Sequence, residues 1–491
     1  MRSSLASPSL VLVALSSLAV AAAAGCISDS DPAAAPLDGG GFETGVSSDG
    51  GGPGNDAGGA GVDGGGGDGS AGDSAATDSG AVDSGDSGDA ATTSGPLSAC
   101  DPATRVDTLR GVNGAVTLSA AGYGDKWVVT WFQIASVSPD SQYHWKARYF
   151  DGAALATEVD LGIDVYGVQN PIVADGSGRA FAQRFNSSDG DRRVFDFATG
   201  TFASATTFPV VNSGDEFFAL APIPGGGALS LFRNGTNVVA DKWVPATPSW
   251  TTTGLAGLPA LSYGLRVAAN AAGKAVALWY NSDGSGGNDL HVAAYDGATW
   301  SAPVTKSLPN DGGSSGEFQP VMLPNGDAII GWVQSGTSIV TSRFHGGTFD
   351  APVEVEAAAG SAKLDMVADS AGRVSVAFFK GGHVHVRRDL GAGYLAEQDV
   401  ATATDYRLAV NPATDEVTLV TYNLPTLQIQ RIAPTSNTWT ASLPMNMGIS
   451  NGTLPKRQTA VVFDSAGRPT VLSMQDASGS GGLELFAAKC H

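Results

Sequence analysis

The sequence of 491 residues predicts an all-β protein, an eight-bladed β-propeller preceded by a signal peptide and a disordered linker. Three observations predict this fold. One short phrase recurs eight times at intervals of about fifty residues, the segments around it are apolar without helical periodicity, and the first hundred residues have a composition unsuited to a packed core. The expected domains are therefore residues 1–25, 26–98 and 99–491.

The first expected domain is a cleaved export signal. Arg2 is followed by an apolar stretch over residues 10–24, which at about fifteen residues is too short for a permanent membrane-spanning helix. The "AAGC" at residues 23–26 resembles a bacterial lipobox, although the usual pattern has Leu in place of Ala23. The resemblance implies a lipid on Cys26, and hence a membrane anchor in the cell envelope, at the outer membrane or cell surface. The alternative is ordinary cleavage after Ala24, which would leave Cys26 as a spare thiol.

The second expected domain, residues 26–98, is a lipid-anchored linker rich in Gly, Ser and Asp. Residues 28–98 carry 13 acidic and no basic side chains, and Phe42 is their only aromatic residue. Such a segment cannot bury enough apolar surface to offset the entropy of ordering it, so we expect disorder. The remaining chain has 35 acidic residues against 26 basic residues beyond Arg2. A domain of mildly acidic charge is not expected to bind nucleic acid.

The repeated phrase defines the units of the third domain. Clear copies are "VADGSGRAFAQRF" at 173–185, "VADSAGRVSVAFF" at 367–379 and "VFDSAGRPTVLSM" at 462–474. The turn residues of all eight copies are spaced 44 to 53 residues apart: Asp125, Gly178, Gly226, Gly273, Gly326, Gly372, Glu416 and Gly467. A period near fifty over eight units is typical of a propeller or array. The alternative is seven blades, with one weak unit absorbed into a neighbour.

Each unit is expected to form four short strands. In the fifth, "QPVML", "DAIIGWV", "SIVTSRF" and "APVEVE" follow one another over residues 319–356, and the turn "PNG" permits a tight hairpin. The position six residues after each turn residue is aromatic in six of the eight units: Trp131, Arg184, Phe232, Trp279, Trp332, Phe378, Tyr422 and Ser473. We expect this column to pack between blades.

The two ends of the domain predict a ring closure. The eighth unit ends at its third strand, "LELFAA", whereas "ATRVDTL" at 103–109 precedes the first unit and belongs to none. If this segment completes the last blade, Cys100 and Cys490 lie at adjacent strand ends, within reach of a disulfide. Export to an oxidising compartment permits the bond. The chain-entropy expression gives about 5 to 6 kcal/mol of stabilisation for so long a loop, as an upper bound.

The repeats resemble those of secreted bacterial propellers with the Asp-box turns of the sialidase superfamily. The best copy is "YDGATWSAP" at 295–303, where Asp296, Gly297 and Trp300 follow the pattern with the Asp one residue nearer to the Gly, and "SNTWTAS" at 436–442 is fainter. The resemblance covers residues 101–491 in the style of the repeat. It implies a fold-stabilising turn and carries no implication for activity.

No catalytic residues and no cofactor are predicted. A sialidase would need an early Arg motif, and the nearest string, "RIAP" at 431–434, is late and one residue too long. Quinone-dependent eight-bladed dehydrogenases usually have adjacent cysteines, which this chain lacks. There is no Gly-x-Ser-x-Gly or His-Glu-x-x-His motif to indicate a hydrolase.

No metal site is predicted either. His383 and His385 share one face of a strand, but no further ligand is evident, so an exposed outer strand is favoured. The loops at 281–289 and 186–193 are rich in oxygen donors but lack the spacing of a known calcium loop, so solvated turns are favoured.

The candidate ligand site is in the central channel, which the first strand of each blade lines. Counting back four residues from each hairpin turn gives Leu118, Pro171, Ala219, Arg266, Gln319, Asp365, Arg407 and Ala460. Four consecutive members are polar, namely Arg266, Gln319, Asp365 and Arg407, and two Arg favour a carboxylate or sulfate. The alternative is that Asp365 pairs with one of the Arg residues and the cluster is structural.

The sequence therefore predicts a cell-surface lipoprotein whose propeller is a non-catalytic binding or scaffolding module, with a carbohydrate or protein as its ligand. The alternatives are an extracellular carbohydrate-active enzyme of sialidase type, and a purely structural envelope protein. Convergence of three or more carboxylates and aromatic residues on one pocket would favour the enzyme.

Overall fold

The structure is a computed structural model of the whole chain. The chain divides into two units, residues 1–85 and 86–491, and all described residues belong to the second. The structure describes residues 97–108, 118–134, 143–164, 171–186, 189–209, 218–223, 225–234, 237–255, 262–282, 288–308, 318–334, 338–357, 363–423, 426–447, 459–476 and 483–491. The expected signal peptide, Cys26 and nearly all of the linker lie outside these residues.

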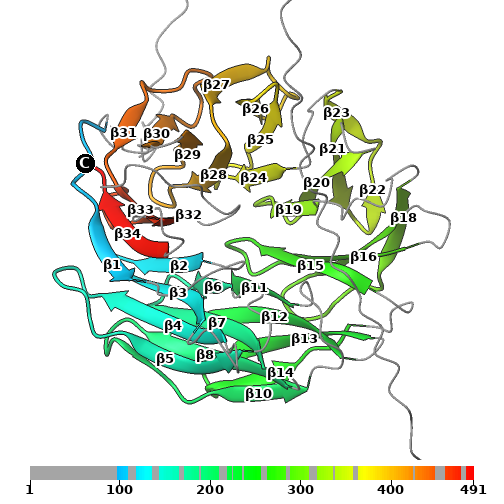
Figure 1. The fold of residues 1–491 in the computed structure, drawn as a ribbon. Helices are drawn as coiled ribbons and strands as arrows, with labels where there is room; N and C mark the ends of the chain where they lie inside the picture. The colour runs from blue at the N-terminus through cyan, green and yellow to red at the C-terminus, as the bar shows by residue number, and fades with distance from the viewer. Residues whose placement is uncertain are drawn as a thin grey trace, which may run out of the picture. The chain divides into compact units, whose positions relative to one another are not determined.

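The described residues form eight antiparallel sheets, which confirms eight blades and rules out seven (Figure 1). Blade 1 contains β2 (Leu118–Tyr123), β3 (Lys126–Ile134), β4 (Tyr143–Phe150) and β5 (Val159–Asp164). Blade 2 contains β6 (Ile172–Ala174), β7 (Arg179–Asn186), β8 (Asp189–Asp196), β9 (Thr201–Phe202) and β10 (Thr206–Pro209). Blade 3 contains β11 (Phe218–Ile223), β12 (Gly227–Asn234), β13 (Asn237–Val244) and β14 (Ser249–Thr252).

The next three blades repeat this plan. Blade 4 contains β15 (Ser262–Ala269), β16 (Ala275–Ser282), β17 (Asn288–Tyr295) and β18 (Val304–Leu308). Blade 5 contains β19 (Phe318–Met322), β20 (Ala328–Gln334), β21 (Ser338–His345), β22 (Thr348–Phe349) and β23 (Val353–Glu356). Blade 6 contains β24 (Leu364–Ala368), β25 (Val374–Lys380), β26 (His383–Asp389) and β27 (Gln398–Thr402).

The last two blades close the ring. Blade 7 contains β28 (Asp405–Val410), β29 (Val417–Asn423), β30 (Thr426–Ile432) and β31 (Leu443–Met445). Blade 8 contains β32 (Thr459–Phe463), β33 (Pro469–Asp476), β34 (Leu483–Lys489) and, from the other end of the domain, β1 (Thr104–Thr108). The described part of the chain contains no helix long and apolar enough to cross a membrane.

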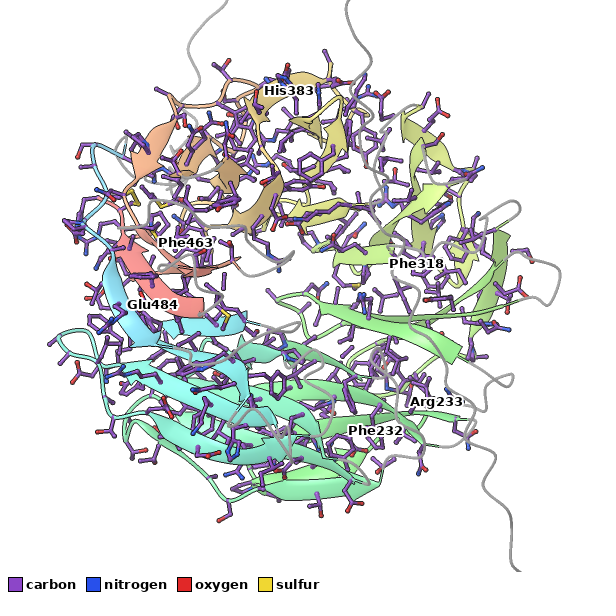
Figure 2. All side chains as sticks on the ribbon, viewed as in Figure 1. Phe232, Arg233, Phe318, His383, Phe463 and Glu484 are labelled. Atoms are coloured by element: carbon purple, nitrogen blue, oxygen red, sulfur yellow. A yellow bond between two sulfur atoms is a disulfide. The ribbon has the colours of Figure 1, made fainter. Side chains whose placement is uncertain are left out.

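The predicted closure of blade 8 is confirmed. Strand β1 pairs antiparallel with β34, and the ion pair between Arg105 and Glu484 lies across this pairing at 3.3 Å (Figure 2). Cys490, directly after β34, faces Cys100, four residues before β1, and their sulfurs are bonded. The first and last strands of the domain are thus joined by hydrogen bonds, an ion pair and a disulfide.

The hairpin turn between the first two strands of a blade explains the repeated phrase. In the turn "DSAG" at 464–467, one carboxylate oxygen of Asp464 accepts hydrogen bonds from Ala466 N and Arg468 N, at 3.0 and 2.8 Å. Gly467 has φ of +74°, which an L-residue rarely adopts. The same Asx arrangement begins the hairpins at Asp175, Asn270 and Asp369. The recurring Asp or Asn and Gly are therefore required by the backbone of the turn.

The aromatic column packs between blades, as predicted. All eight side chains of the column are buried, including Arg184 and Ser473 at the two positions that lack an aromatic ring. Arg184 replaces the ring by placing its guanidinium over the ring of Trp145 and pairing with Asp191 at 2.9 Å. A flat cation can occupy the place of an aromatic ring where a carboxylate neutralises it.

Candidate functional site in the central channel

The first strands of the eight blades are the innermost strands of the ring (Figure 1). We call the space that they surround the central channel. Each one contacts the first strand of the next blade, in the order β2, β6, β11, β15, β19, β24, β28 and β32, and β32 contacts β2. Each is an edge strand of its sheet, so one side of its backbone has no partner strand within the blade. Residues on these strands are therefore the ones that a ligand in the channel would meet.

An open cavity of about 310 Å³ lies among five of these inner strands, and the polar atoms on its surface belong to the backbone. Its walls are residues 220–222 of β11, 267–269 of β15, 320–322 of β19, 367–368 of β24 and Val410 of β28. All twelve are Leu, Ala, Pro, Val or Met. These residues precede the hairpin turns, so the cavity is at the end of the channel where the inner strands finish.

Two of the four candidate residues hold neighbouring blades together. Asp365 is only 3% exposed and accepts hydrogen bonds from Leu408 N at 2.7 Å and from Gln319 Nε2 at 3.1 Å. Gln319 in turn accepts a hydrogen bond from Met366 N at 2.8 Å. Each side chain thus satisfies a backbone N–H on the inner strand of the following blade, which is a structural role.

The third candidate, Arg407, has a different environment. Its side chain is 54% exposed, and Nη1 lies 3.8 Å from Asp365 Oδ1. This distance is longer than a hydrogen bond, and Asp365 already accepts two shorter ones. Arg407 therefore adjoins a buried carboxylate while half of its side chain remains open to solvent.

The pairing register places Arg407 and Leu118 outside the column to which counting assigned them. Gln319 and Asp365 pair with the residue just before the aromatic position, whereas Arg407 pairs with Val420, two residues before Tyr422. The hairpin of blade 7 is longer, with Asp415 at φ of +59°, and that of blade 1 is shorter. A shift of one residue moves a side chain to the other face of a strand.

The column positions in blades 1 and 7 belong instead to Ser119 and Tyr406, which pair with Thr130 and Thr421. Ser119 accepts a hydrogen bond from Ile172 N of the next blade at 3.0 Å. This contact repeats the arrangement at Gln319 and Asp365. The shared function of this column in three blades is therefore to tether the adjacent inner strand.

The fourth candidate, Arg266, lies on β15, which contacts β19. Its Nη1 donates to the carbonyl of Leu265 at 2.9 Å, next to an irregular step in the pairing of β15 with β16. Arg266 directly precedes the cavity residue Val267. The structure thus links Gln319, Asp365 and Arg407 by side-chain contacts and places Arg266 on the neighbouring inner strand.

A polar group that no sequence pattern indicated lies beside these residues. Lys363 Nζ binds the carboxylate of Asp405, donates to Tyr406 O at 2.7 Å and lies 4.3 Å from the centre of the Tyr406 ring. The Tyr406 hydroxyl lies 2.8 Å from Lys363 O. Burial raises the pKa of Tyr406 well above its ordinary value, so the hydroxyl stays a neutral donor.

The pair of His residues lies on β26, away from the inner strands. His383 Nδ1 lies 3.0 Å from Asp399, and His385 Nδ1 lies 2.6 Å from Glu397. His385 is only 8% exposed, so the expectation of an exposed strand is wrong for it. Among the described residues, no group of three His, Cys, Asp or Glu could hold a metal ion. Residues 283–287 and 187–188 of the two candidate calcium loops lie outside the described residues.

A buried ionic cluster joins blades 2 and 3, and no sequence pattern indicated it. Arg192 pairs with Asp241 at 2.8 Å, and its guanidinium lies 4.3 and 4.4 Å from the ring centres of Phe208 and Trp250. Burial lowers the pKa of Arg192, and the Asp241 charge opposes that shift. The cluster is enclosed by aromatic rings and has a packing role.

No protein-family model matches the sequence, and no curated protein matches it. Among solved structures, the chain is similar to the Dos1 propeller, with 10% identity, a TM-score of 0.48, and coverage of 79% of this chain and 95% of that one. It is also similar to the polysaccharide lyase Uly1, with 10% identity, a TM-score of 0.44, and coverage of 67% and 91%.

A further similar structure is the β-propeller domain of the Trilobed protease from Pyrococcus furiosus, with 9% identity, a TM-score of 0.41, and coverage of 66% of this chain and 97% of that one. These likenesses concern the fold. The chain is an eight-bladed β-propeller, and its function has to be argued from its own channel.

Proposed function

We propose that this protein is a non-catalytic binding module that holds a small anionic ligand, such as an acidic sugar, in its central channel. The observation that carries the proposal is the half-exposed guanidinium of Arg407 on an inner strand. Asp365 already accepts two shorter hydrogen bonds, so Arg407 keeps donors for a carboxylate or sulfate. Arg266, on another inner strand, is the second candidate donor.

The cavity favours binding over catalysis. A carbohydrate-active enzyme would need carboxylates that converge on its substrate. The twelve described residues that line the cavity include no carboxylate and no aromatic ring, and Asp365 is committed to backbone and amide donors. These features support a module that recognises a ligand without transforming it.

We further propose that the turn at Asp296 belongs to the Asp-box type that the sequence resembles. One oxygen of Asp296 accepts from Ala298 N at 2.8 Å and from Thr299 N at 2.7 Å. The equivalent turns at Asp151 and Asp196 are built in the same way, and Asp389 accepts from the second and fourth residues after it. This recurrence supports a role in blade stability.

Location at the cell surface is part of the proposal and depends on Cys26. Expression of the Cys26→Ser variant should release the protein from the membrane fraction into the soluble fraction. Unchanged partition into membranes would contradict lipid anchoring and point to protein contacts.

The binding test compares the full chain with the variants Arg407→Ala and Arg266→Ala/Arg407→Ala by titration calorimetry with glucuronate. A charge-assisted hydrogen bond contributes about 1.5 to 3 kcal/mol, so Arg407→Ala should raise Kd roughly 10- to 150-fold. The double variant should lose detectable binding with a nearly unchanged Tm. Arg343→Ala is the matched control. Arg343 lies on the third strand of blade 5, is 43% exposed and pairs with Asp327. Equal affinity of the double variant and this control would contradict the proposal.

A further inference from the structure

We infer that the channel ligand is an amphipathic anion, whose charged group lies at Arg407 and whose apolar body occupies the cavity. The inference rests on the proposed function, because it takes the anion-binding residue from it. It adds a second subsite and changes the expected ligand class from a hydrophilic acidic sugar to a carboxylate or sulfate with an aliphatic or aromatic portion.

The cavity has the size and lining of an apolar subsite. Its volume of about 310 Å³ is at the lower end of the range for small-ligand sites, about 300 to 1,000 Å³. Three of its lining residues, Ala221, Ala268 and Ala368, have small side chains. An aliphatic or aromatic group in this open space would cover the apolar side chains of the walls, whereas a sugar hydroxyl would find only backbone partners there.

The charged groups and the cavity are at successive levels of the same strands. On β28, Arg407 is three residues before the cavity residue Val410, so at about 3.3 Å per residue their Cα atoms are roughly 10 Å apart and their side chains leave opposite faces of the strand. On β24, Asp365 is two residues before Val367. Polar groups therefore occupy the level where the inner strands begin, and apolar groups the level where they end. A ligand that spans both levels must itself be polar at one end and apolar at the other.

This arrangement predicts a dependence of affinity on chain length that charge alone would not produce. Each methylene transferred from water into an apolar site strengthens binding about fourfold. The straight-chain carboxylates from butyrate to decanoate carry the same charge and differ only in apolar length. Their affinity should rise about fourfold per methylene and then level off when the cavity is full.

The experiment titrates the full chain with butyrate, hexanoate, octanoate and decanoate, with glucuronate and octyl glucoside as comparison ligands. The cavity variant is Val367→Thr/Val410→Thr, which keeps the side-chain volume and adds two hydroxyls to the wall. Its matched control is Val304→Thr, a half-buried Val on the outer strand β18. We expect the cavity variant to weaken octanoate binding at least tenfold and to leave glucuronate binding within twofold. The control should leave both unchanged, and thermal unfolding verifies that all variants are folded.

The outcomes separate this inference from the proposed function. If glucuronate and all the carboxylates bind with one affinity that Arg407→Ala abolishes, anion binding stands and the apolar subsite is wrong. If affinity rises with chain length but neither Val substitution changes the slope, the apolar contact is elsewhere and the inference is also wrong. A third outcome is that the dependence of affinity on chain length requires the Val residues, while Arg407→Ala has no effect and octyl glucoside binds equally well. In that case the cavity is an apolar subsite, but the amphipathic anion and the proposed function are both wrong.

Discussion

Asp365 and Arg407 are in contact, yet they are suited to different tasks. The carboxylate of Asp365 is buried and accepts hydrogen bonds from blades 5 and 7, so its removal would leave a backbone N–H of Leu408 without an acceptor. Arg407 contributes a single long contact to this group and remains half exposed. At the scale of single residues, Asp365 therefore has a structural role, whereas Arg407 is able to bind a ligand.

His291 offers a test of the buried polar contacts through pH. Its imidazole is buried on β17 against Asn281 and Thr305, and this burial lowers its pKa below 6.5, with the nearby Asp289 opposing the shift. The folded state thus binds a proton less readily than the unfolded state, so its contribution to stability is complete above pH 6.5 and is lost as the pH falls below that value. Thermal unfolding between pH 5 and 8 should show a smaller loss of Tm on acidification in His291→Gln than in the native protein. Parallel curves for the two proteins would contradict this account.

At the scale of elements, the hairpin between the first two strands of a blade is the best-specified part of the molecule. An Asx residue satisfies two N–H groups, and a Gly three positions after it takes the one left-handed backbone position, within a single turn. These turns also contact one another, because Asn411 Nδ2 donates to Gly467 O at 2.8 Å and Ser465 Oγ lies 3.0 Å from Asp125. The turns therefore fix each blade and its neighbour together.

A comparison of two glycines distinguishes the effect of the left-handed backbone position within a turn from the effect of the contact between neighbouring turns. Gly273 and Gly467 have nearly the same φ, +76° and +74°, but a Cβ at Gly273 would meet no atom within 4 Å, whereas one at Gly467 would lie 2.4 Å from Asn411 Nδ2. Gly273→Ala should cost about 1 to 2 kcal/mol of unfolding free energy, the usual cost of a left-handed L-residue. Gly467→Ala should cost clearly more, because it also displaces Asn411 from the turn of blade 8. Urea denaturation of both variants measures the difference, and equal costs would show that the contact between turns is unimportant.

The same elements show how much of the fold was predictable. The hairpin sequence recurs eight times because each blade needs the same tight turn between its first two strands. The number of copies therefore predicts the number of blades. The polar column was only partly predictable, because the extra residue in the turn near Asp415 shifts Arg407 to the other face of β28. Contacts such as that of Lys363 with Asp405, or Arg192 with Asp241, join residues that are 42 and 49 positions apart. Their partners are set by the spatial order of the blades and leave no local pattern.

At the scale of the whole molecule, the ring depends on the two ends of the domain. Strand β1 is the outermost strand of blade 8, and the bond between Cys100 and Cys490 lies just beyond its pairing with β34. Backbone hydrogen bonds from Asp101 N to Lys489 O at 2.8 Å and from His491 N to Ala99 O at 2.9 Å extend this pairing past the disulfide. Blade 8 is therefore complete only when both ends are in place.

Loss of the disulfide between Cys100 and Cys490 should lower the stability of the whole propeller. Mass mapping of the native protein without reduction should recover one peptide pair that contains both Cys100 and Cys490. The Cys100→Ser/Cys490→Ser variant should unfold at a lower temperature, by an amount that corresponds to at most about 5 to 6 kcal/mol for a loop of this length. Its channel should bind ligand unchanged below the transition, since the cysteines are on the outer strands of blade 8. Two free thiols in the native protein would remove the disulfide from this account.

The claim that the central channel is the binding site is tested most directly by a crystal structure of the full chain soaked with octanoate. We predict electron density for one molecule, with its carboxylate within hydrogen-bonding distance of Arg407 and its alkyl chain between Val367 and Val410. Ligand density between the outer strands of two blades, with an empty channel, would contradict the claim.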